Sequence, residues 1–122
     1  MSVPSEHPPA RKPDVTADDF AALDLRVGRV VAVEDFPEAR RPSYKLTVDF
    51  GPTVGVLTTS AQITTYAAEH LVDRQVIGAI NLGVRRIAGF ASQFLVLGGI
   101  DEQGRVHLLA PDATLPPGSP VA

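Results

Sequence analysis

The chain has 122 residues, 44% of them hydrophobic and 20% charged, which predicts one globular domain with a single modest core. It has no cysteine, which excludes disulfide bonds and thiolate metal sites. The net charge of −3 argues against a large non-specific nucleic-acid surface. However, positions 14–38 hold seven acids and two arginines, whereas positions 40–97 hold six bases and three acids. A small polyanion-binding face is therefore expected in the middle of the chain.

The first 24 residues predict a tail and a short helix. Residues 1–14 hold four prolines and no hydrophobic periodicity, so we expect a flexible tail ahead of a domain over 15–122. Thr16 and Asp19 match a capping box, which predicts a short helix over 17–22. No stretch has the apolar length of a signal peptide core or a membrane span, which predicts a soluble, cytoplasmic protein without membrane insertion.

Alternating apolar residues predict the first two strands. Residues 25–33 form a long strand in which Gly28 marks a bend or bulge, as small barrels require of their first strand. Its expected inward face is Leu25, Val27, Val31 and Val33. Residues 44–50 alternate most regularly. Their expected inward face is Tyr44, Leu46, Val48 and Phe50.

Three further strands and a connecting helix follow. Gly51-Pro52 predicts a turn into a third strand over 53–59, and the alanine-rich segment around 67–71 predicts a short helix. Strands four and five are predicted over 75–81 and 93–97, turns at 98–99 and 102–104, and a short extra strand over 105–109. The last twelve residues hold four prolines and form neither a central strand nor a helix, so they predict an extended tail.

This order of elements predicts an all-β protein with short helices, a five-stranded OB-fold β-barrel. The alternative all-β arrangement is an SH3-like barrel, which lacks a helix between its third and fourth strands. The predicted helix near residue 69 favours the OB-fold.

The residues of the common catalytic and metal sites are not arranged for chemistry. His7, His70 and His107 match no metal-ligand spacing. Ser60 has no flanking glycines that would form a nucleophile elbow, and no glycine-rich phosphate loop follows a strand. We therefore expect a non-enzymatic binding module with no metal site and no cofactor.

A basic surface is expected where OB-folds bind nucleic acid, across strands two and three and the neighbouring loops. Lys45 lies on the polar face of strand two, and Arg40 and Arg41 precede it. Arg85 and Arg86 lie in a predicted glycine-flanked loop between strands four and five. Arginine pairs with phosphate and also stacks on bases, so these five cations are candidate RNA-binding residues.

Three further residues near the Arg-Arg loop allow two interpretations each. Asn81 and Ser92, at the ends of the flanking strands, either read base edges or hold the loop. Phe90 is either an exposed stacking group or a hydrophobic lid over the barrel. The other candidate aromatic residues fall on apolar faces, so recognition is expected to depend on phosphate contacts and RNA shape.

The segment Asn81–Gly99, with Arg85, Arg86, Gly89 and Ser92 in their present spacing, resembles the signature of the tRNA-binding OB domains appended to methionyl-tRNA synthetases. Four blocks in register are similar to a stand-alone group of that family, the CsaA-type export chaperones. These blocks are DFPEARRPSYKLTVDFG (35–51), SAQIT (60–64), AGF (88–90) and LVLGG (95–99).

The resemblance implies an OB-fold homodimer whose terminal extensions, including the C-terminal one, help to build the interface. It implies tRNA binding and, for the CsaA-type group, binding of unfolded chains or preproteins. The positions that match the family's motifs are Lys45, Ser60, Gln62, Asn81, Arg85, Arg86, Gly89 and Ser92.

Two functions are therefore carried forward. The first is binding of tRNA or another structured RNA by the basic face. The second is an export-related chaperone that binds unfolded or preprotein peptides in an apolar groove at a dimer interface.

Overall fold

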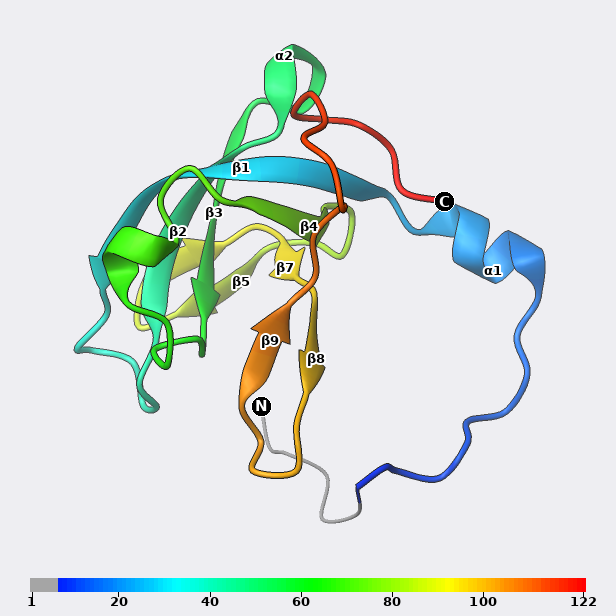
Figure 1. The fold of residues 1–122 in the computed structure, drawn as a ribbon, viewed down its shortest axis with the longest axis horizontal. Helices are drawn as coiled ribbons and strands as arrows, with labels where there is room; N and C mark the ends of the chain where they lie inside the picture. Colours follow the sequence, from blue (N-terminus) through cyan, green and yellow to red (C-terminus); the bar gives the residue numbers. More distant parts are fainter. Residues whose placement is uncertain (1–6) are drawn as a thin grey trace.

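The computed structural model describes residues 7–122. Its helical segments are short: α1 (Ala17–Ala22), α2 (Gly51–Val54) and the 3₁₀ turn η1 (Ala68–His70). Its strands are β1 (Leu25–Asp35), β2 (Tyr44–Asp49), β3 (Val56–Ala61), β4 (Gln75–Ala79), β5 (Arg85–Ile87), β6 (Phe90–Ser92), β7 (Leu95–Val96), β8 (Gly98–Ile100) and β9 (Val106–Leu108). Figure 1 shows a barrel from which α1 and the β8–β9 hairpin project.

Five strands form one antiparallel sheet in the order β3-β2-β1-β4-β7. The sheet curls until its edges meet: the Gln93 amide donates to the Thr58 carbonyl at 2.7 Å, and the Thr59 hydroxyl donates to the Phe94 carbonyl at 2.6 Å. The result is a nearly closed five-stranded barrel with η1 between β3 and β4. This confirms the predicted OB-fold and its connecting helix.

The core confirms the predicted alternation of β2. Tyr44, Leu46, Val48 and Phe50 are at most 9% exposed, and the residues between them are half-buried on the outer side. These four side chains belong to one cluster with residues of β1, β4 and the η1 region. Burial of this alternating face is what the hydrophobic effect demands of a barrel strand.

Strand β1 is bulged, and this corrects its predicted inward face. Its register against β2 shifts between Val30 and Ala32, so Val30 is fully buried and Val31 is 39% exposed. The prediction that Val31 points inward is therefore wrong, because the extra residue moves the alternation by one position. The first part of β1 pairs with β4 and the second with β2, which is how one strand serves two sides of the barrel.

The third strand begins later than predicted, because residues 51–54 form the helical turn α2. The Asp49 carboxylate accepts from the Gly51 amide at 2.8 Å, and the Gly55 amide donates back to the Gly51 carbonyl at 2.7 Å. Pro52 stands in the first turn, where a helix tolerates proline. Local turn chemistry thus replaces the start of the predicted strand.

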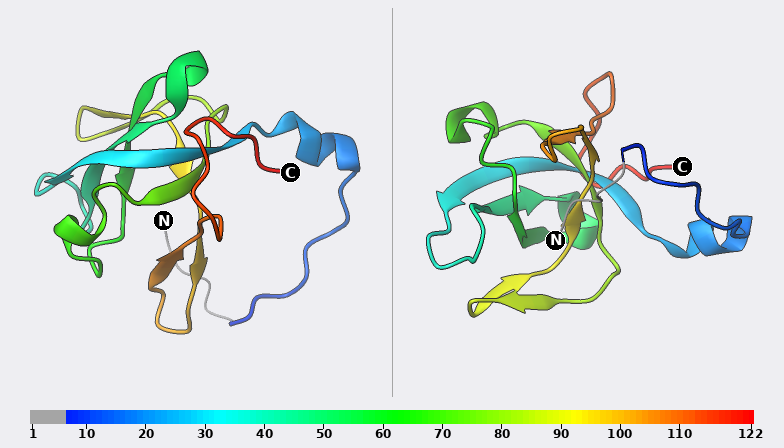
Figure 2. Two further views of the ribbon diagram at one scale, coloured as in Figure 1. Left: turned by 45° about the horizontal axis from the view of Figure 1, so that its top comes forward. Right: turned by 90° about the horizontal axis from the view of Figure 1, so that it is seen from below.

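Two hairpins replace predicted loops or turns. Arg85 and Arg86 lie in β5, paired with β6, where a loop was predicted. The connecting residues Ala88 and Gly89 both have positive φ, at 48° and 81°, as in the tight turns that match strand twist. Likewise, Gly98 and Gly99 belong to β8 rather than to a turn, and they pair with β9. Figure 2 shows β5–β6 (yellow) as an arm that leaves the barrel.

The two terminal segments differ in their contacts. Residues 1–6 of the predicted tail lie outside the described residues, and residues 7–14 are exposed and extended. The C-terminal segment lies along β1 of the same chain: the Gly118 amide donates to the Val27 carbonyl at 2.7 Å, and the Val27 amide donates to the Ser119 carbonyl at 2.9 Å. The predicted extended C-terminal tail is confirmed, and these bonds attach it to the barrel.

Among residues 7–122, no helix combines the length and apolar character that a membrane span requires.

Candidate nucleic-acid interface

Lys45 anchors the β5–β6 arm to the barrel. Its ammonium lies 4.8 Å from the ring centroid of Phe36 and 5.1 Å from that of Phe90. The two rings contact each other edge to face, with centroids 5.5 Å apart. Phe36 follows β1 and Phe90 opens β6, so this cation–π cluster of Lys45 and the two rings joins the barrel to the arm. It places Lys45 and the arm on the same side of the molecule.

A row of paired residues crosses this side. Lys45 on β2 is opposite Ser60 on β3, and Arg85 on β5 is opposite Ser92 on β6. The two pairs are joined because the Ser60 amide donates to the Ser92 hydroxyl at 3.2 Å. Cross-strand neighbours share a face, so the row brings together four of the predicted site residues from four strands.

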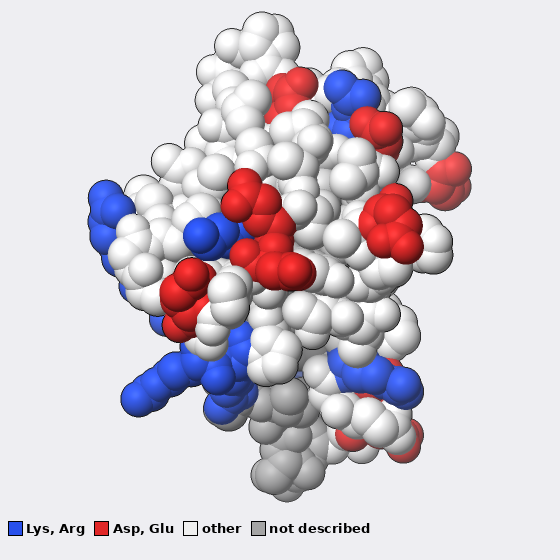
Figure 3. All heavy atoms as spheres, turned by 90° about the vertical axis from the view of Figure 1, so that its left-hand side faces the viewer, with Lys and Arg blue, Asp and Glu red and all other residues white. Residues whose placement is uncertain are grey.

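Four of the five site cations form no ion pair with an acidic residue in the described part of the chain. No ion pair involves Arg40, Lys45, Arg85 or Arg86 among residues 7–122, whereas Arg11, Arg26, Arg29 and Arg105 each pair with an aspartate there. We use the name basic face for the five predicted site cations, Arg40, Arg41, Lys45, Arg85 and Arg86, of which the row above brings Lys45 and Arg85 together. In Figure 3, basic groups lie along the left edge and cluster at the lower left, with others elsewhere on this view, and acidic groups occupy its middle.

The two arginines of the doublet do not act as one unit. Neighbours in a strand point to opposite sides, so Arg85 shares the Ser92 side of the arm and Arg86 takes the other. The Arg86 guanidinium donates to the Gly89 carbonyl at 3.3 Å, across the turn. The Arg85 guanidinium makes no hydrogen bond within the described residues, and it lines a cleft together with Ser60, Gln62 and Ser92. Arg85 is thus the better placed of the two for a ligand in that cleft.

Asn81 and Ser92 have structural bonds. The Asn81 side-chain oxygen accepts from the Asp24 amide at 2.8 Å, and its nitrogen donates to the Ala22 carbonyl at 2.8 Å. Asn81 therefore ties the end of α1 to the barrel, and these bonds do not involve the segment of Arg85 and Arg86, so both predicted roles of Asn81 stay predictions. The Ser92 hydroxyl bonds the Thr59 hydroxyl at 2.9 Å and accepts from the Ser60 amide, so it helps to close the barrel.

The sequence analysis did not identify Phe36 or Gln93. Phe36 is 4% exposed and supports Lys45. The Gln93 side-chain oxygen accepts from the Thr58 amide at 2.9 Å, so it replaces a main-chain partner between β3 and the residues after β6. The sequence placed Phe36 in the connection after the predicted strand over 25–33, where its partners, which are distant in the chain, leave no local signal.

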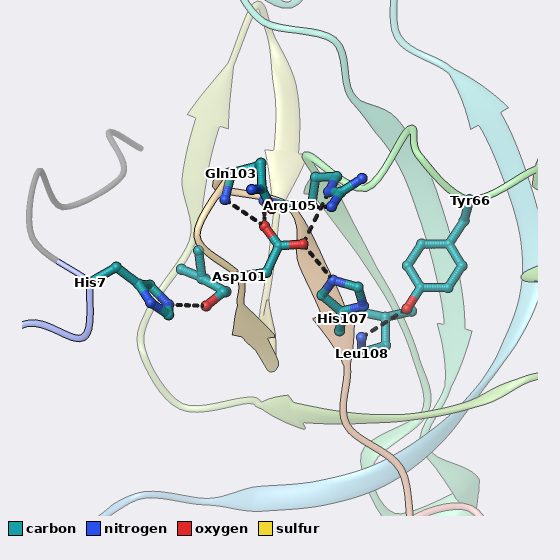
Figure 4. Close-up of polar contacts among 8 residues, drawn as sticks. His7, Tyr66, Asp101, Gln103, Arg105, His107 and Leu108 are labelled. Carbon is teal, nitrogen blue, oxygen red and sulfur yellow. Dashed lines mark hydrogen bonds and ion pairs between the residues drawn. The ribbon is translucent and has the colours of Figure 1, made fainter.

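A separate polar cluster stabilises the β8–β9 hairpin (Figure 4). The Asp101 carboxylate accepts three hydrogen bonds within the hairpin, from His107 Nε2 at 2.8 Å, from the Arg105 guanidinium Nε at 3.0 Å and from the Gln103 main-chain amide at 2.9 Å. The bond from His107 is the main reason that the pKa of Asp101 lies well below its usual range. His7 donates to the Ile100 carbonyl at 2.8 Å on the other side of the hairpin.

Among residues 7–122, no three His, Asp or Glu side chains come together as metal ligands. The expected absence of a metal site and of a cofactor stays a prediction.

Residues 25–120 match the family model described as "Putative tRNA binding domain". A methionine–tRNA ligase of Sorangium cellulosum is 41% identical over 106 residues. That match covers 87% of this chain but only 15% of the ligase, so the chain spans a small part of this relative.

Two solved structures match over their whole length. They are the chaperone CsaA of Bacillus anthracis (43% identity, TM-score 0.85, 90% of this chain and 100% of that one) and the CsaA chaperone of Picrophilus torridus (42%, 0.85, 89% and 100%). These matches confirm the resemblance seen in residues 81–99 and in the four sequence blocks. The chain therefore belongs to the tRNA-binding-domain family, and CsaA chaperones are among its full-length structural relatives.

Proposed function

We propose that this protein binds tRNA, or another structured RNA, through the basic face. The observation that carries the proposal is that Arg40, Lys45, Arg85 and Arg86 share no ion pair with an acidic residue in the described chain. A cation that is already paired must give up its partner to bind phosphate, whereas these four do not. The family match and the OB-fold support the same class of ligand.

The net charge of −3 affects how strongly the protein binds RNA and how that affinity depends on salt. Long-range attraction of RNA is weak, so affinity depends on the local cations and falls steeply as salt rises. Such a role requires no catalytic group and is exercised where tRNA is found, in the cytoplasm. The proposed ligand residues are the five cations of the basic face with Ser60, Gln62, Asn81 and Ser92 beside them.

The test is retention of tRNA across salt concentrations by the double variant Arg85→Ala, Arg86→Ala. Each lost phosphate contact is expected to reduce the slope of log affinity against log salt by about 1, so the double variant should lose about 2. The matched control is Arg11→Ala, Arg29→Ala, which removes the same charge from two arginines that are paired with aspartates. The site assignment is wrong if the first variant binds tRNA as wild type does at every salt concentration.

A second candidate is the binding of unfolded or preprotein peptides as an export-related chaperone. It is favoured by the two CsaA chaperones that this chain matches at 42–43% identity over their full length. We place this activity in an apolar groove between two copies of the chain. The test is suppression of the aggregation of an unfolded protein. Suppression that persists at high salt and is lost when the terminal segments are removed supports this candidate. Equal suppression by the trimmed protein contradicts the groove.

The dimer on which that candidate depends is also a proposal. α1 has no buried residue, and Val15, Phe20 and Leu23 on and beside it are 75%, 47% and 42% exposed. A six-residue helix is not stable alone, so its apolar side needs a partner surface. A second copy of the chain would supply that surface.

A further inference from the structure

An open cleft of about 340 Å³ lies between the end of β3, the connection from β4 to β5, and the β8–β9 hairpin. Most of its wall is apolar, with contributions from Leu82, Phe94, Leu95, Ile100 and Val106. Leu82, Leu95 and Ile100 are 54%, 44% and 37% exposed, which is costly for large apolar side chains unless a ligand covers them. The volume is within the range of about 300–1,000 Å³ that small-ligand clefts occupy.

One side of the cleft is polar and carries a single charge. Ser60 and Gln62 lie there at the end of β3, and Arg85 lies there on the arm. No other lining residue is charged. Within residues 7–122, neither the Arg85 guanidinium nor the side-chain amide of Gln62 has a hydrogen-bond partner. The cleft therefore combines apolar walls with a side-chain amide and a cation that have no hydrogen-bond partner in the described chain.

We propose that this cleft receives the base of one unpaired nucleotide, whose phosphate is held by Arg85. The inference rests on the RNA binding proposed above and gives it a substrate class, RNA with an unstacked nucleotide. A flat heterocycle with polar edges fits apolar walls beside an amide, and its anionic group fits the lone cation. Arg85 also belongs to the basic face, so the sugar-phosphate backbone of an RNA bound to the other cations can continue to the cleft. Bases in a continuous duplex are stacked and cannot enter.

An apolar peptide is the competing occupant, and the charge pattern favours the nucleotide. A peptide of neutral side chains would cover the same walls but leave the Arg85 charge without a counterion. The lining holds no carboxylate that would repel phosphate.

The experiment compares two RNA hairpins that differ by one bulged adenosine, with Leu82→Trp as the cleft-filling variant. Leu109→Trp is the matched control, since Leu109 is similarly exposed, at 46%, and does not line the cleft. Wild type and the control should bind the bulged hairpin about tenfold more tightly than the paired one, the scale of one base–protein stacking contact. Leu82→Trp should lose this preference and keep the affinity for the paired hairpin.

The outcomes separate the two proposals. Equal binding of both hairpins by wild type overturns the nucleotide site and leaves RNA binding intact. If neither hairpin nor tRNA binds at low salt, the proposed function fails, and a titration with adenosine 5′-monophosphate followed by NMR decides the cleft alone. Saturable shifts of the Ser60 and Gln62 amides then support the site, and no shift overturns it. The site is also overturned if Leu82→Trp blocks an unfolded polypeptide but not the nucleotide.

Discussion

At the residue scale, the Phe50 ring leaves room only for glycine at one position in each of the neighbouring strands β1 and β4. Its ring packs over Gly28 of β1 and Gly78 of β4, and it meets Phe94 edge to face with centroids 4.9 Å apart. A Cβ atom at Gly28 would lie 2.5 Å from Val48 Cγ1 and 2.7 Å from Phe50 Cε1. Gly28 therefore has a packing role, and the strand bulge falls three residues later, near Val31.

We predict that Gly28→Ala lowers the free energy of unfolding by about 1–3 kcal/mol, the usual cost of overpacking a core. Val48 and Phe50, the side chains that the new methyl group would meet, are fully buried and have little room to move. The matched control is Gly99→Ala, because no atom lies within 4 Å of a Cβ built there. Urea denaturation measures both, and equal stability of the two variants contradicts the packing role.

A second prediction at this scale concerns pH and Asp101. The unfolded carboxyl titrates at about 4, and hydrogen bonds keep the folded pKa well below its usual range. Ionised Asp101 therefore stabilises the fold above about pH 4, and this contribution is lost as the pH falls toward the folded pKa. Asp101→Asn should be less stable than wild type at neutral pH, and the difference should shrink below about pH 4.

Chemical denaturation between pH 7 and pH 2 provides the measurement. Asp112→Asn serves as the control, since that exposed carboxylate makes no hydrogen bond within the described residues. A stability difference for Asp101→Asn that stays constant over the whole range would mean that its charge does not support the hairpin.

At the scale of elements, the position of α1 depends on one side chain outside it. Asn81 follows β4 and bonds the main chain at Ala22 and Asp24, on either side of the link from α1 to β1. We predict that Asn81→Ala costs about 1–2 kcal/mol and speeds hydrogen exchange at the Asp24 amide, because that amide loses its acceptor. The β2 amides should stay protected.

Gln62→Ala is the control for this variant, since the Gln62 amide has no hydrogen-bond partner among residues 7–122. It should leave both stability and exchange unchanged. Retention of tRNA by Asn81→Ala tests whether Asn81 also reads RNA. Unchanged retention means that its role is the structural one seen at Ala22 and Asp24. A selective loss of tRNA with intact exchange means that it reads RNA.

Local sequence patterns were enough to predict some elements but not others. The capping box predicted α1, and both halves of it are present, with the Asp19 amide donating to the Thr16 hydroxyl at 3.2 Å. Strict alternation predicted β2 in full. The arm was missed, because a three-residue strand pair has too few positions to show a period of two. Its turn, Ala-Gly, is also not among the usual hairpin pairs.

At the scale of the whole molecule, the proposed dimer makes a direct prediction. Phe20→Ser with Leu23→Ser should shift the mass seen by light scattering from two copies toward one, because each buried apolar side chain contributes about 1.5–3 kcal/mol. Val56→Ser is the control, since Val56 is 58% exposed at the start of β3, away from α1. If wild type is a single copy at every concentration tested, the dimer proposal and the groove between copies are both wrong.

The sequence by itself determined the barrel, its core strand and the cations that make up the basic face. These follow from alternation, capping and residue type, which act between neighbours in the chain. Tertiary structure alone decided the bulge at Val31, the cluster of Phe36, Lys45 and Phe90, the structural bonds of Asn81 and which cations form no ion pair within the described residues. Each of these depends on side chains brought together from distant strands, and no local period records such contacts.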